Sequence, residues 1–489
     1  MKSDSAGEKI LYKYRHAISF GVVGLFALIV AIWRFWALPN GLSSEEIAAA
    51  TTAGHFSPGQ ILSEVVNLPW TILEWISIMI FGASTLAFRL PAVILMILAA
   101  GGLILLLRKW TRNNIAIISG FWAVTSTLFI GLARSGTSAA MTTFLIVMIL
   151  LSTSIIVRAV EEFGQGKEEN RVKRSWQALL AKIIVCVALA LFCYQAAGIY
   201  LVMLLVAVGV IHPKTRLIFL KSKPWKIAVG AVAGLAVLTP LIIGLIAGGW
   251  SVIKVWLALD GAWSLDHLGT LGSTLIGFDS GLVGGLIIPV VTLVALVMAV
   301  LGAMKLCTDI LSARSYLTLS LSLVTLVLAA WQPTLVYLLF VPAILLITVG
   351  IETLVRQWYD LFPRNPYARA LAVLPLAIMI ASLGWTSIMR FGLSQNYDIN
   401  VTCHYNQEFM AARDVLVKDK KARVLVVAPD QKKFYEILER DFSGLKVVTK
   451  LQKDSKNIVL NSASIKVQKT PIHIATGSHS NHAVLLRVY

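Results

Sequence analysis

Two adjacent carboxylates, Glu45 and Glu46, follow Ser43 and Ser44 and precede an alanine-rich run. Ser43 with Glu46 three residues later is the capping-box pattern that begins an α-helix. The cap assigns Glu46 a structural role. A supporting role in an active site is the second interpretation. Glu45 lies about 100° round the helix from Glu46 and is not needed for the cap. A carboxylate there, facing a membrane surface, is a candidate general base. The plainer alternative is that Glu45 only complements the helix dipole, which is worth about 0.3–1 kcal/mol.

The other candidate residues are cations at the outer ends of apolar stretches and polar residues in the outer segments. Arg134 lies in a tight turn and is the strongest candidate to bind a phosphate, with contact to lipid headgroups or to a loop acid as an equal alternative. Arg89 is a secondary substrate candidate, although a helix-start anchor that pairs with Glu64 or Glu74 is the favoured interpretation.

Two polar residues in the outer segments, His55 and Asp266, could also bind substrate. Neither belongs to a set with the spacing of metal ligands, and solvated loop residues of this kind are common. No metal site is therefore predicted, and no cofactor is certain. A divalent cation is the one cofactor that the sequence leaves open.

The composition defines the class of protein that carries these residues. The chain has 489 residues, of which 57% are hydrophobic and 14% charged, and its mean hydropathy is +0.78. A water-soluble core does not need so much apolar sequence, so we predict a polytopic α-helical membrane protein. The net charge of +18 comes mostly from short clusters between apolar stretches, where Lys and Arg indicate the cytosolic side. We therefore expect the protein to contact membrane lipids and to bind no nucleic acid.

The same clusters predict the topology. Residues 1–16 are a cytosolic segment, residues 17–389 contain eleven spans, and the C-terminus lies outside. Apolar stretches with basic residues at both ends must return to the same side as hairpins. The long outer segments are 37–89, which carries the two carboxylates, and 248–280, after which a span is expected over 281–304. The three hairpins are expected to turn outside at Arg134–Thr137, Tyr194–Gln195 and Trp331–Thr334.

Residues 390–489 change to a pattern of short alternating strands and predict a small α/β domain outside the membrane. One helix is expected over 431–440, and no glycine-rich phosphate loop follows the first strand, so no nucleotide is predicted. The strands are expected over 423–428, 445–449, 456–460, 472–476 and 484–488.

Five short motifs occur in a fixed order: GLSSEEIA at 41–48, FGAS at 81–84, RLPA at 89–92, Ala133-Arg134, and YLLFVP at 337–342. As an ordered set they resemble the GT-C membrane glycosyltransferases, over roughly residues 17–351. Within that fold the set is similar to the protein O-mannosyltransferase and lipid A aminoarabinose transferase group, which includes the dolichyl-phosphate-mannose-protein mannosyltransferases of glycosyltransferase family 39.

The resemblance implies a GT-C fold and an inverting transfer of a sugar at the outer face of the cell membrane. The donor would be a polyprenyl-phosphate sugar, and the acceptor a protein Ser/Thr or an envelope glycolipid. Glu45 occupies the place of the family's catalytic Asp. Two departures concern the donor phosphate: Gln332 and Gln195 stand where relatives have Arg or His and, in some members, Lys.

Two other classes of function stay open as alternatives. A transporter or flippase for lipid-linked material would need paired ionisable residues near span centres and an internal repeat, and the sequence has neither. A non-catalytic envelope assembly protein of the same fold is compatible with Gln195 and Gln332.

Overall fold

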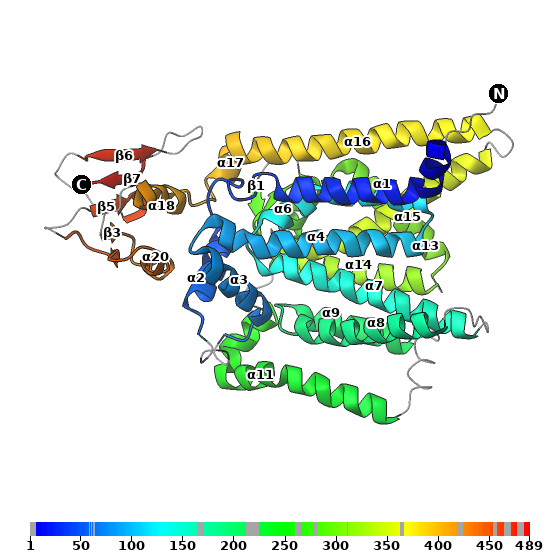
Figure 1. Cartoon of the computed structure of the whole chain (residues 1–489), viewed down its shortest axis with the longest axis horizontal. Coiled ribbons are helices and arrows are strands. Elements are labelled where there is room, and N and C mark those ends of the chain that lie inside the picture. Colours follow the sequence, from blue (N-terminus) through cyan, green and yellow to red (C-terminus); the bar gives the residue numbers. More distant parts are fainter. Residues whose placement is uncertain are drawn as a thin grey trace.

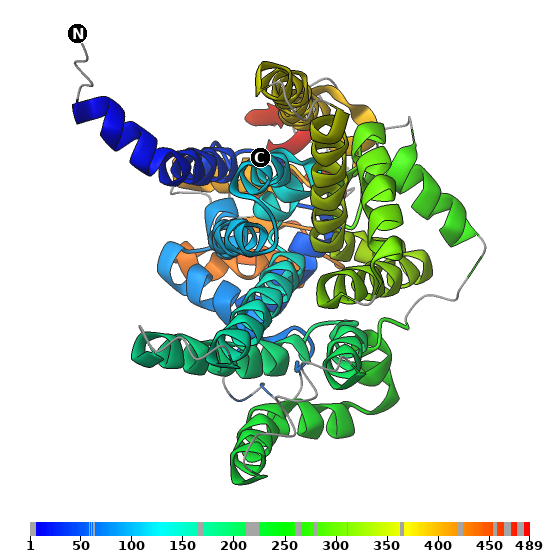
Figure 2. The same ribbon diagram turned by 90° about the vertical axis from the view of Figure 1, so that its right-hand side faces the viewer.

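The structure is a computed structural model in which long helices run side by side and a small sheet domain stands at one end (Figure 1). Figure 2 looks along these helices from the end at which α1 begins. The residues that the structure describes are 6–57, 59, 61, 64–164, 171–211, 224–259, 264, 266–277, 281–310, 312–361, 366–418, 424–452, 457–463, 471–476 and 484–489.

Seven of the described helices are long and apolar enough to cross a membrane, and an eighth is gained if two helices joined by a bend of 53° form one span. This confirms a multi-pass membrane protein, while the number of eleven spans stays a prediction. The seven are α1 (Ala6–Ile32), α4 (Thr85–Trp110), α7 (Ser138–Gly164), α11 (Pro224–Trp256), α14 (Ala313–Trp331), α15 (Phe340–Leu361) joined to η2 (Pro333–Leu339), and α16 (Pro366–Tyr397). The bent pair is α5 (Asn113–Thr125) and α6 (Thr127–Arg134), and the shorter apolar helices are α3 (Leu68–Phe81), α8 (Arg171–Phe192), α9 (Gly198–Ile211) and α13 (Leu293–Thr308).

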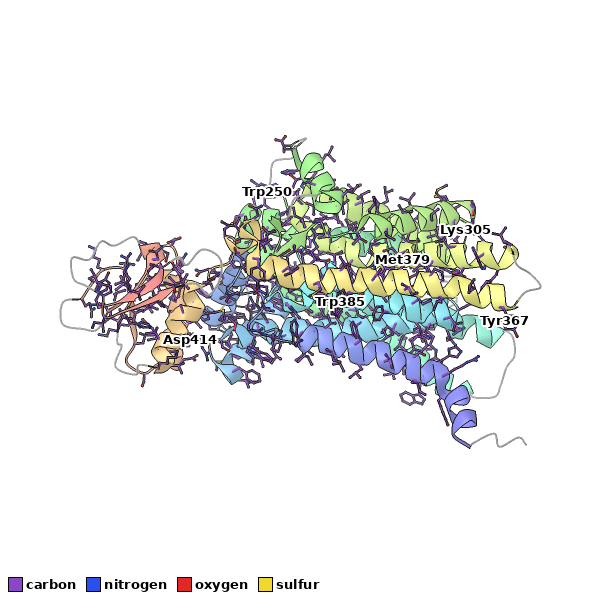
Figure 3. The ribbon with its side chains drawn as sticks, turned by 90° about the horizontal axis from the view of Figure 1, so that it is seen from above. Trp250, Lys305, Tyr367, Met379, Trp385 and Asp414 are labelled. Carbon is purple, nitrogen blue, oxygen red and sulfur yellow. The ribbon has the colours of Figure 1, made fainter. Side chains whose placement is uncertain are left out.

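Large apolar side chains cover the outside of this bundle. Trp385 on α16 and Trp250 on α11 are each 62% exposed, and Figure 3 shows α16 with Met379 and Trp385 along the outer side of the bundle. A water-soluble protein rarely exposes a continuous apolar surface of this kind, whereas the lipid tails of a bilayer cover it at no cost.

The turns of the three predicted hairpins are present, while the side of the membrane on which they lie stays a prediction. The turn after α6 occupies residues 135–137, the turn between α8 and α9 occupies 193–197, and α14 ends at Trp331 before η2. In each case a basic flank at both ends of a long apolar stretch was enough to require a reversal.

The span predicted to begin at residue 281 is wrong in its first part. Strands β1 (Gly281–Val283) and β2 (Leu286–Ile288) form an antiparallel hairpin there. Gly284 and Gly285 supply its turn, with φ of 56° and 74°, and glycine adopts such values without steric cost. Helix α13 begins only at Leu293, where the Thr292 side chain caps it by accepting from the Ala295 N–H. The prediction failed because a run of apolar residues occurs both in short strands and in helices, and periodicity alone does not distinguish them.

Helices α13 and α15 pack at very close range. A Cβ atom at Gly302 would overlap the carbonyl of Leu346, and one at Gly350 would overlap that of Met298. Helices in lipid associate through such small-residue contacts, because a hydrophobic driving force between them is absent. These glycines therefore hold α15, which follows η2, against the bundle.

The C-terminal residues form the predicted α/β domain. Five strands form a sheet in the order β4-β3-β5-β7-β6, in which β3 is parallel to β4 and β5 and the other pairs are antiparallel. All five lie within the predicted strand ranges, whereas the predicted helix 431–440 is divided into two single turns. The elements are α17 (Ile399–Thr402), α18 (Glu408–Lys418), β3 (Val424–Val426), α19 (Lys432–Tyr435), α20 (Leu438–Asp441), β4 (Lys446–Val448), β5 (Asn457–Leu460), η3 (Asn461–Ala463), β6 (His473–Thr476) and β7 (Val484–Val488).

The outer segments lie at the same end as this domain. The first contains α2 (Ser44–His55) and α3, and Figure 1 shows both between the bundle and the sheet domain. The second begins inside α11, which continues to Trp256 through a kink at Gly249, and then forms α12 (Asp266–Ile276). The end of the bundle next to the sheet domain is therefore where the candidate residues must be sought.

Candidate active site

Helix α2 begins with the predicted capping box. The Ser43 N–H donates to Oε2 of Glu46 at 2.9 Å, and the Glu46 N–H donates to Oγ of Ser43 at 3.2 Å. The cap fixes where the helix starts, so Glu45 and Glu46 occupy its first turn and point in different directions.

Glu46 also forms a buried ion pair with Arg89, the first residue of the RLPA motif. The Arg89 guanidinium donates from Nε to Oε1 at 2.8 Å and from Nη2 to Oε2 at 3.2 Å. Glu46 is 1% and Arg89 0% exposed. The Gly136 N–H donates to the same carboxylate at 2.9 Å. The pair therefore joins α2, α4 and the turn between α6 and α7.

The remaining donors of Arg89 bind the chain that leads into α2. Nη1 donates to the carbonyls of Phe35 and Pro39, at 3.3 and 2.9 Å, and Nη2 donates to that of Gly41. All five N–H groups of the guanidinium are thus used. The predicted pairing of Arg89 with Glu64 or Glu74 is wrong, because Glu46 takes this position.

Glu45 differs from Glu46 in its surroundings. Its side chain is half-buried, and its Oε2 accepts a hydrogen bond from Oγ of the neighbouring Ser44 at 3.1 Å. The β1–β2 turn lies close by, since a Cβ atom at Gly285 would lie 3.8 Å from Oγ of Ser43. The arrangement leaves one carboxylate locked in an ion pair and its neighbour partly exposed at the end of the bundle that carries the sheet domain.

Arg134 is buried at the end of α6, with 3% of its side chain exposed. Its Nη2 donates to the carbonyls of Val30 and Trp33 at 2.9 and 3.0 Å, and the guanidinium lies 5.0 Å from the ring of Phe391. Among the described residues, Nε has no hydrogen-bond partner. The residue holds the outer end of α1, and its role in phosphate binding stays a prediction.

His55 and Asp266 are not brought to the carboxylates by contacts of their own. His55 is the last residue of α2, and its Nε2 lies 2.7 Å from the Lys433 carbonyl of the C-terminal domain. Asp266 is the exposed first residue of α12. In the described part of the chain, no three His, Cys, Asp or Glu side chains lie close enough together to hold a metal ion.

A buried carboxylate that the sequence suggested only as a partner of Arg89 lies near Glu46. Glu74 on α3 is 0% exposed, and within the described structure neither of its oxygens has a hydrogen-bond partner. Burial raises the pKa of Glu74 well above its ordinary value, and the nearby Glu46 carboxylate raises it further. The signal in the sequence was that Glu74 is the single charged residue of α3.

The two glutamines that depart from the family pattern differ in burial. Gln195 is 0% exposed and accepts from Oγ1 of Thr142 at 3.2 Å, and its Nε2 is without a partner among the described residues. Gln332 is half-buried and is the C-cap residue that follows α14. Gln195 therefore offers two N–H donors inside the bundle that have no partner among the described residues.

The C-terminal domain packs directly on the segment that carries the carboxylates. Leu42 and Asn406 exchange two backbone hydrogen bonds, at 3.0 and 2.8 Å. The ring of Phe409 lies 5.6 Å from that of Phe88, next to Arg89, and 5.1 Å from that of Phe434. Gly54 of α2 faces the side chain of Ile437 so closely that a Cβ atom would overlap it. The domain therefore packs against α2 and the segment that leads into it.

This packing predicts that Phe409→Ala destabilises the outer segment. Phe409 is fully buried, and truncation of a buried Phe costs about 3–5 kcal/mol. We expect a lower unfolding temperature in detergent and faster proteolysis near α2. Val417→Ala on the same helix is the control, because Val417 is 54% exposed. Equal effects of the two variants would contradict the shared core.

Comparisons with known proteins agree with this architecture. The family model described as dolichyl-phosphate-mannose-protein mannosyltransferase matches residues 67–243. The fold is similar to that of ArnT from Cupriavidus metallidurans, in the apo state and bound to undecaprenyl phosphate, with a TM-score of 0.57 and 12% identity in both. These alignments cover 96% and 97% of this chain and 98% of ArnT.

The fold is also similar to that of an oligosaccharyltransferase from Archaeoglobus fulgidus, tethered with an acceptor peptide, with a TM-score of 0.51 and 12% identity. That alignment covers 91% of this chain and 60% of the archaeal protein, so the chain spans about three fifths of its length. No curated protein matches the sequence.

Proposed function

We infer that this chain, which has the fold of the GT-C membrane glycosyltransferases, is itself a polyprenyl-phosphate-dependent glycosyltransferase. It moves a sugar from the lipid-linked donor to a hydroxyl of a protein Ser/Thr or an envelope glycolipid at the outer membrane face. The observation that carries this proposal is the pair of carboxylates at the start of α2. Glu46 is locked by Arg89, and Glu45 is left accessible.

In this reaction Glu45 accepts the proton of the acceptor hydroxyl while the hydroxyl oxygen attacks the anomeric carbon of the sugar. The new C–O bond forms as the bond between that carbon and the phosphate oxygen breaks, and the phosphate leaves with the electron pair. Attack from the side opposite the phosphate inverts the configuration. A positioned base of this kind contributes about 10²–10⁴-fold to the rate.

The leaving phosphate needs positive charge or N–H donors. Arg89 is committed to Glu46, so the proposed contacts are Nε of Arg134 and the amide NH2 of Gln195, which have no hydrogen-bond partner in the described part of the chain. The undecaprenyl phosphate bound by the similar ArnT supports a lipid donor of this chemical class. His55, at the end of α2, and Asp266, at the start of α12, are the further proposed contacts to the substrate.

A non-catalytic assembly protein of the same fold is the second candidate. It is favoured by Gln195 and Gln332, which leave the bundle with fewer cations for a phosphate than the family pattern provides. The deciding experiment is transfer of label from radiolabelled polyprenyl-phosphate sugars into a membrane extract that contains the protein. Transfer above that of a membrane without the protein supports the enzyme, and its absence with every donor supports the assembly protein.

The proposed orientation places the N-terminus in the cytosol and the C-terminal domain outside. It predicts that one of two exposed cysteines is labelled from outside and that the other is not. Cys403 precedes α18 on the outer side, and Cys307 lies near the end of α13 on the cytosolic side. In intact cells a membrane-impermeant maleimide is expected to label Cys403 and spare Cys307. Permeabilised cells and the variants Cys403→Ser and Cys307→Ser are the controls. Labelling of Cys307 in intact cells would contradict this orientation and indicate the opposite one.

A further inference from the structure

Tyr405 belongs to the segment that connects α17 to α18, where the bundle meets the C-terminal domain (Figure 1). The residue is 7% exposed. Its hydroxyl oxygen accepts a hydrogen bond from Nε2 of Gln395 on α16 at 3.1 Å, and Gln395 is itself 1% exposed. A tyrosine that is packed around its ring and bonded at its hydroxyl is held in one orientation.

One side of Tyr405 lies against the chain that leads into α2. Gly41 has a φ of 118°, and a Cβ atom there would lie 3.1 Å from Cβ of Tyr405 and 2.8 Å from the carbonyl oxygen of Asn406. The carbonyl of Gly41 accepts a hydrogen bond from Arg89, which binds Glu46. Tyr405 therefore supports the segment that holds the buried ion pair.

The other side of Tyr405 lies among the residues that hold Arg134. Nη2 of Arg134 donates to the carbonyl of Val30 at 2.9 Å, and its guanidinium lies 5.0 Å from the ring of Phe391. Both of these residues share a hydrophobic cluster with Tyr405. The buried members of this cluster are Val30, Ile130, Ile287, Phe391, Val401 and Tyr405.

The separation between the start of α2 and the end of α6 thus depends on a residue that belongs to neither helix. In the proposed reaction Glu45 and Arg134 act on opposite sides of the same carbon atom, and a misplacement of about 1 Å can cost roughly 10²-fold in rate. Burial raises the pKa of Tyr405, and the carboxylate of Glu46 raises it further. The hydroxyl therefore stays protonated, and Tyr405 acts neither as an acid nor as a base.

We propose that Tyr405 is a positioning residue, which sets the separation between the carboxylates at the start of α2 and the guanidinium of Arg134. The ring fills the space between the two groups, and the hydrogen bond from Gln395 fixes the ring. This inference rests on the proposed function, because the separation matters for transfer between Glu45 and a phosphate at Arg134. It makes the segment before α18 a part of the active site.

The kinetic test compares Tyr405→Leu with Tyr405→Phe in the full-length chain. Tyr405→Leu shortens the side chain and is expected to lower kcat for transfer from a radiolabelled polyprenyl-phosphate sugar about 10²-fold. The KM of the donor should change little, because the residues that contact the donor remain. Tyr405→Phe keeps the ring and should retain most of kcat.

Leu486→Ala is the control for a general loss of stability. Leu486 is fully buried on β7 of the same domain, and β7 packs against α18. This variant should lower the unfolding temperature without changing the separation between α2 and α6. A loss of kcat in Leu486→Ala equal to that in Tyr405→Leu would overturn the proposal.

Amide hydrogen exchange at residue resolution tests the same contacts without an activity. The Leu42 N–H donates to the carbonyl of Asn406 at 3.0 Å, and the Gly136 N–H donates to Glu46 at 2.9 Å. Both amides are expected to exchange faster in Tyr405→Leu and at the parent rate in Leu486→Ala.

The two measurements separate this inference from the proposed function. Unchanged exchange of both amides in Tyr405→Leu, or a kcat equal to that of wild type, would show that Tyr405 does not position the site. If wild type transfers no label from any donor, the proposed function fails. Faster exchange in Tyr405→Leu would then still support its role in holding the start of α2.

Discussion

Replacement of Glu45 by Gln is expected to lower the rate of sugar transfer by about 10²–10⁴-fold, which is the contribution of a positioned general base. The amide keeps the size of the side chain and its hydrogen bond to Ser44, but it cannot accept the proton of the acceptor hydroxyl. Because Glu45 is half-buried and takes no part in the ion pair, the unfolding temperature should not change.

The measurement is transfer from a radiolabelled polyprenyl-phosphate sugar, with wild type and variant at matched expression. Glu45→Asp is the informative control, because it restores the carboxylate at a shorter reach and should recover part of the activity. Glu46→Gln should behave differently, with a weakened protein as its main defect. Unchanged transfer by Glu45→Gln, in a preparation where wild type is active, would exclude Glu45 as the base.

Arg89→Met is expected to destabilise the protein by about 3–5 kcal/mol, since it leaves the Glu46 carboxylate buried without a cation. It also removes the donors that hold the carbonyls of Phe35, Pro39 and Gly41. The fully buried guanidinium cannot be replaced by water without a rearrangement of α2. Thermal unfolding in detergent and the amount of folded protein after extraction measure this effect.

Two further variants separate the ion pair from general damage. Arg314→Met removes a pair that is only half-buried, with side chains 26% and 19% exposed, and should cost much less. The double variant Glu46→Gln/Arg89→Met should lose less than the sum of the single losses, because the uncompensated charge has gone. Additive losses would show that Glu46 and Arg89 do not depend on each other.

Much of the architecture follows from local sequence. Apolar stretches with basic flanks predicted the hairpins that turn at 135–137 and 193–197, because the bilayer limits both the length of a helix and the side on which cations remain. Alternation of apolar and polar residues predicted all five C-terminal strands. The β1–β2 hairpin was missed, because two glycines changed the direction of a chain that is apolar throughout.

The sequence by itself determined that Glu46 would cap α2 and that Glu45 would be free of that task, since a capping box joins residues three positions apart. Only the tertiary structure decided which cation meets Glu46. Arg89 is 43 residues away in the chain, and no local pattern distinguishes it from other outer arginines. Phe409 and Ile437 of the C-terminal domain share a hydrophobic core with α2, and this too is a contact between segments that are distant in the sequence. Such contacts depend on how whole helices pack, which spacing in the sequence does not encode.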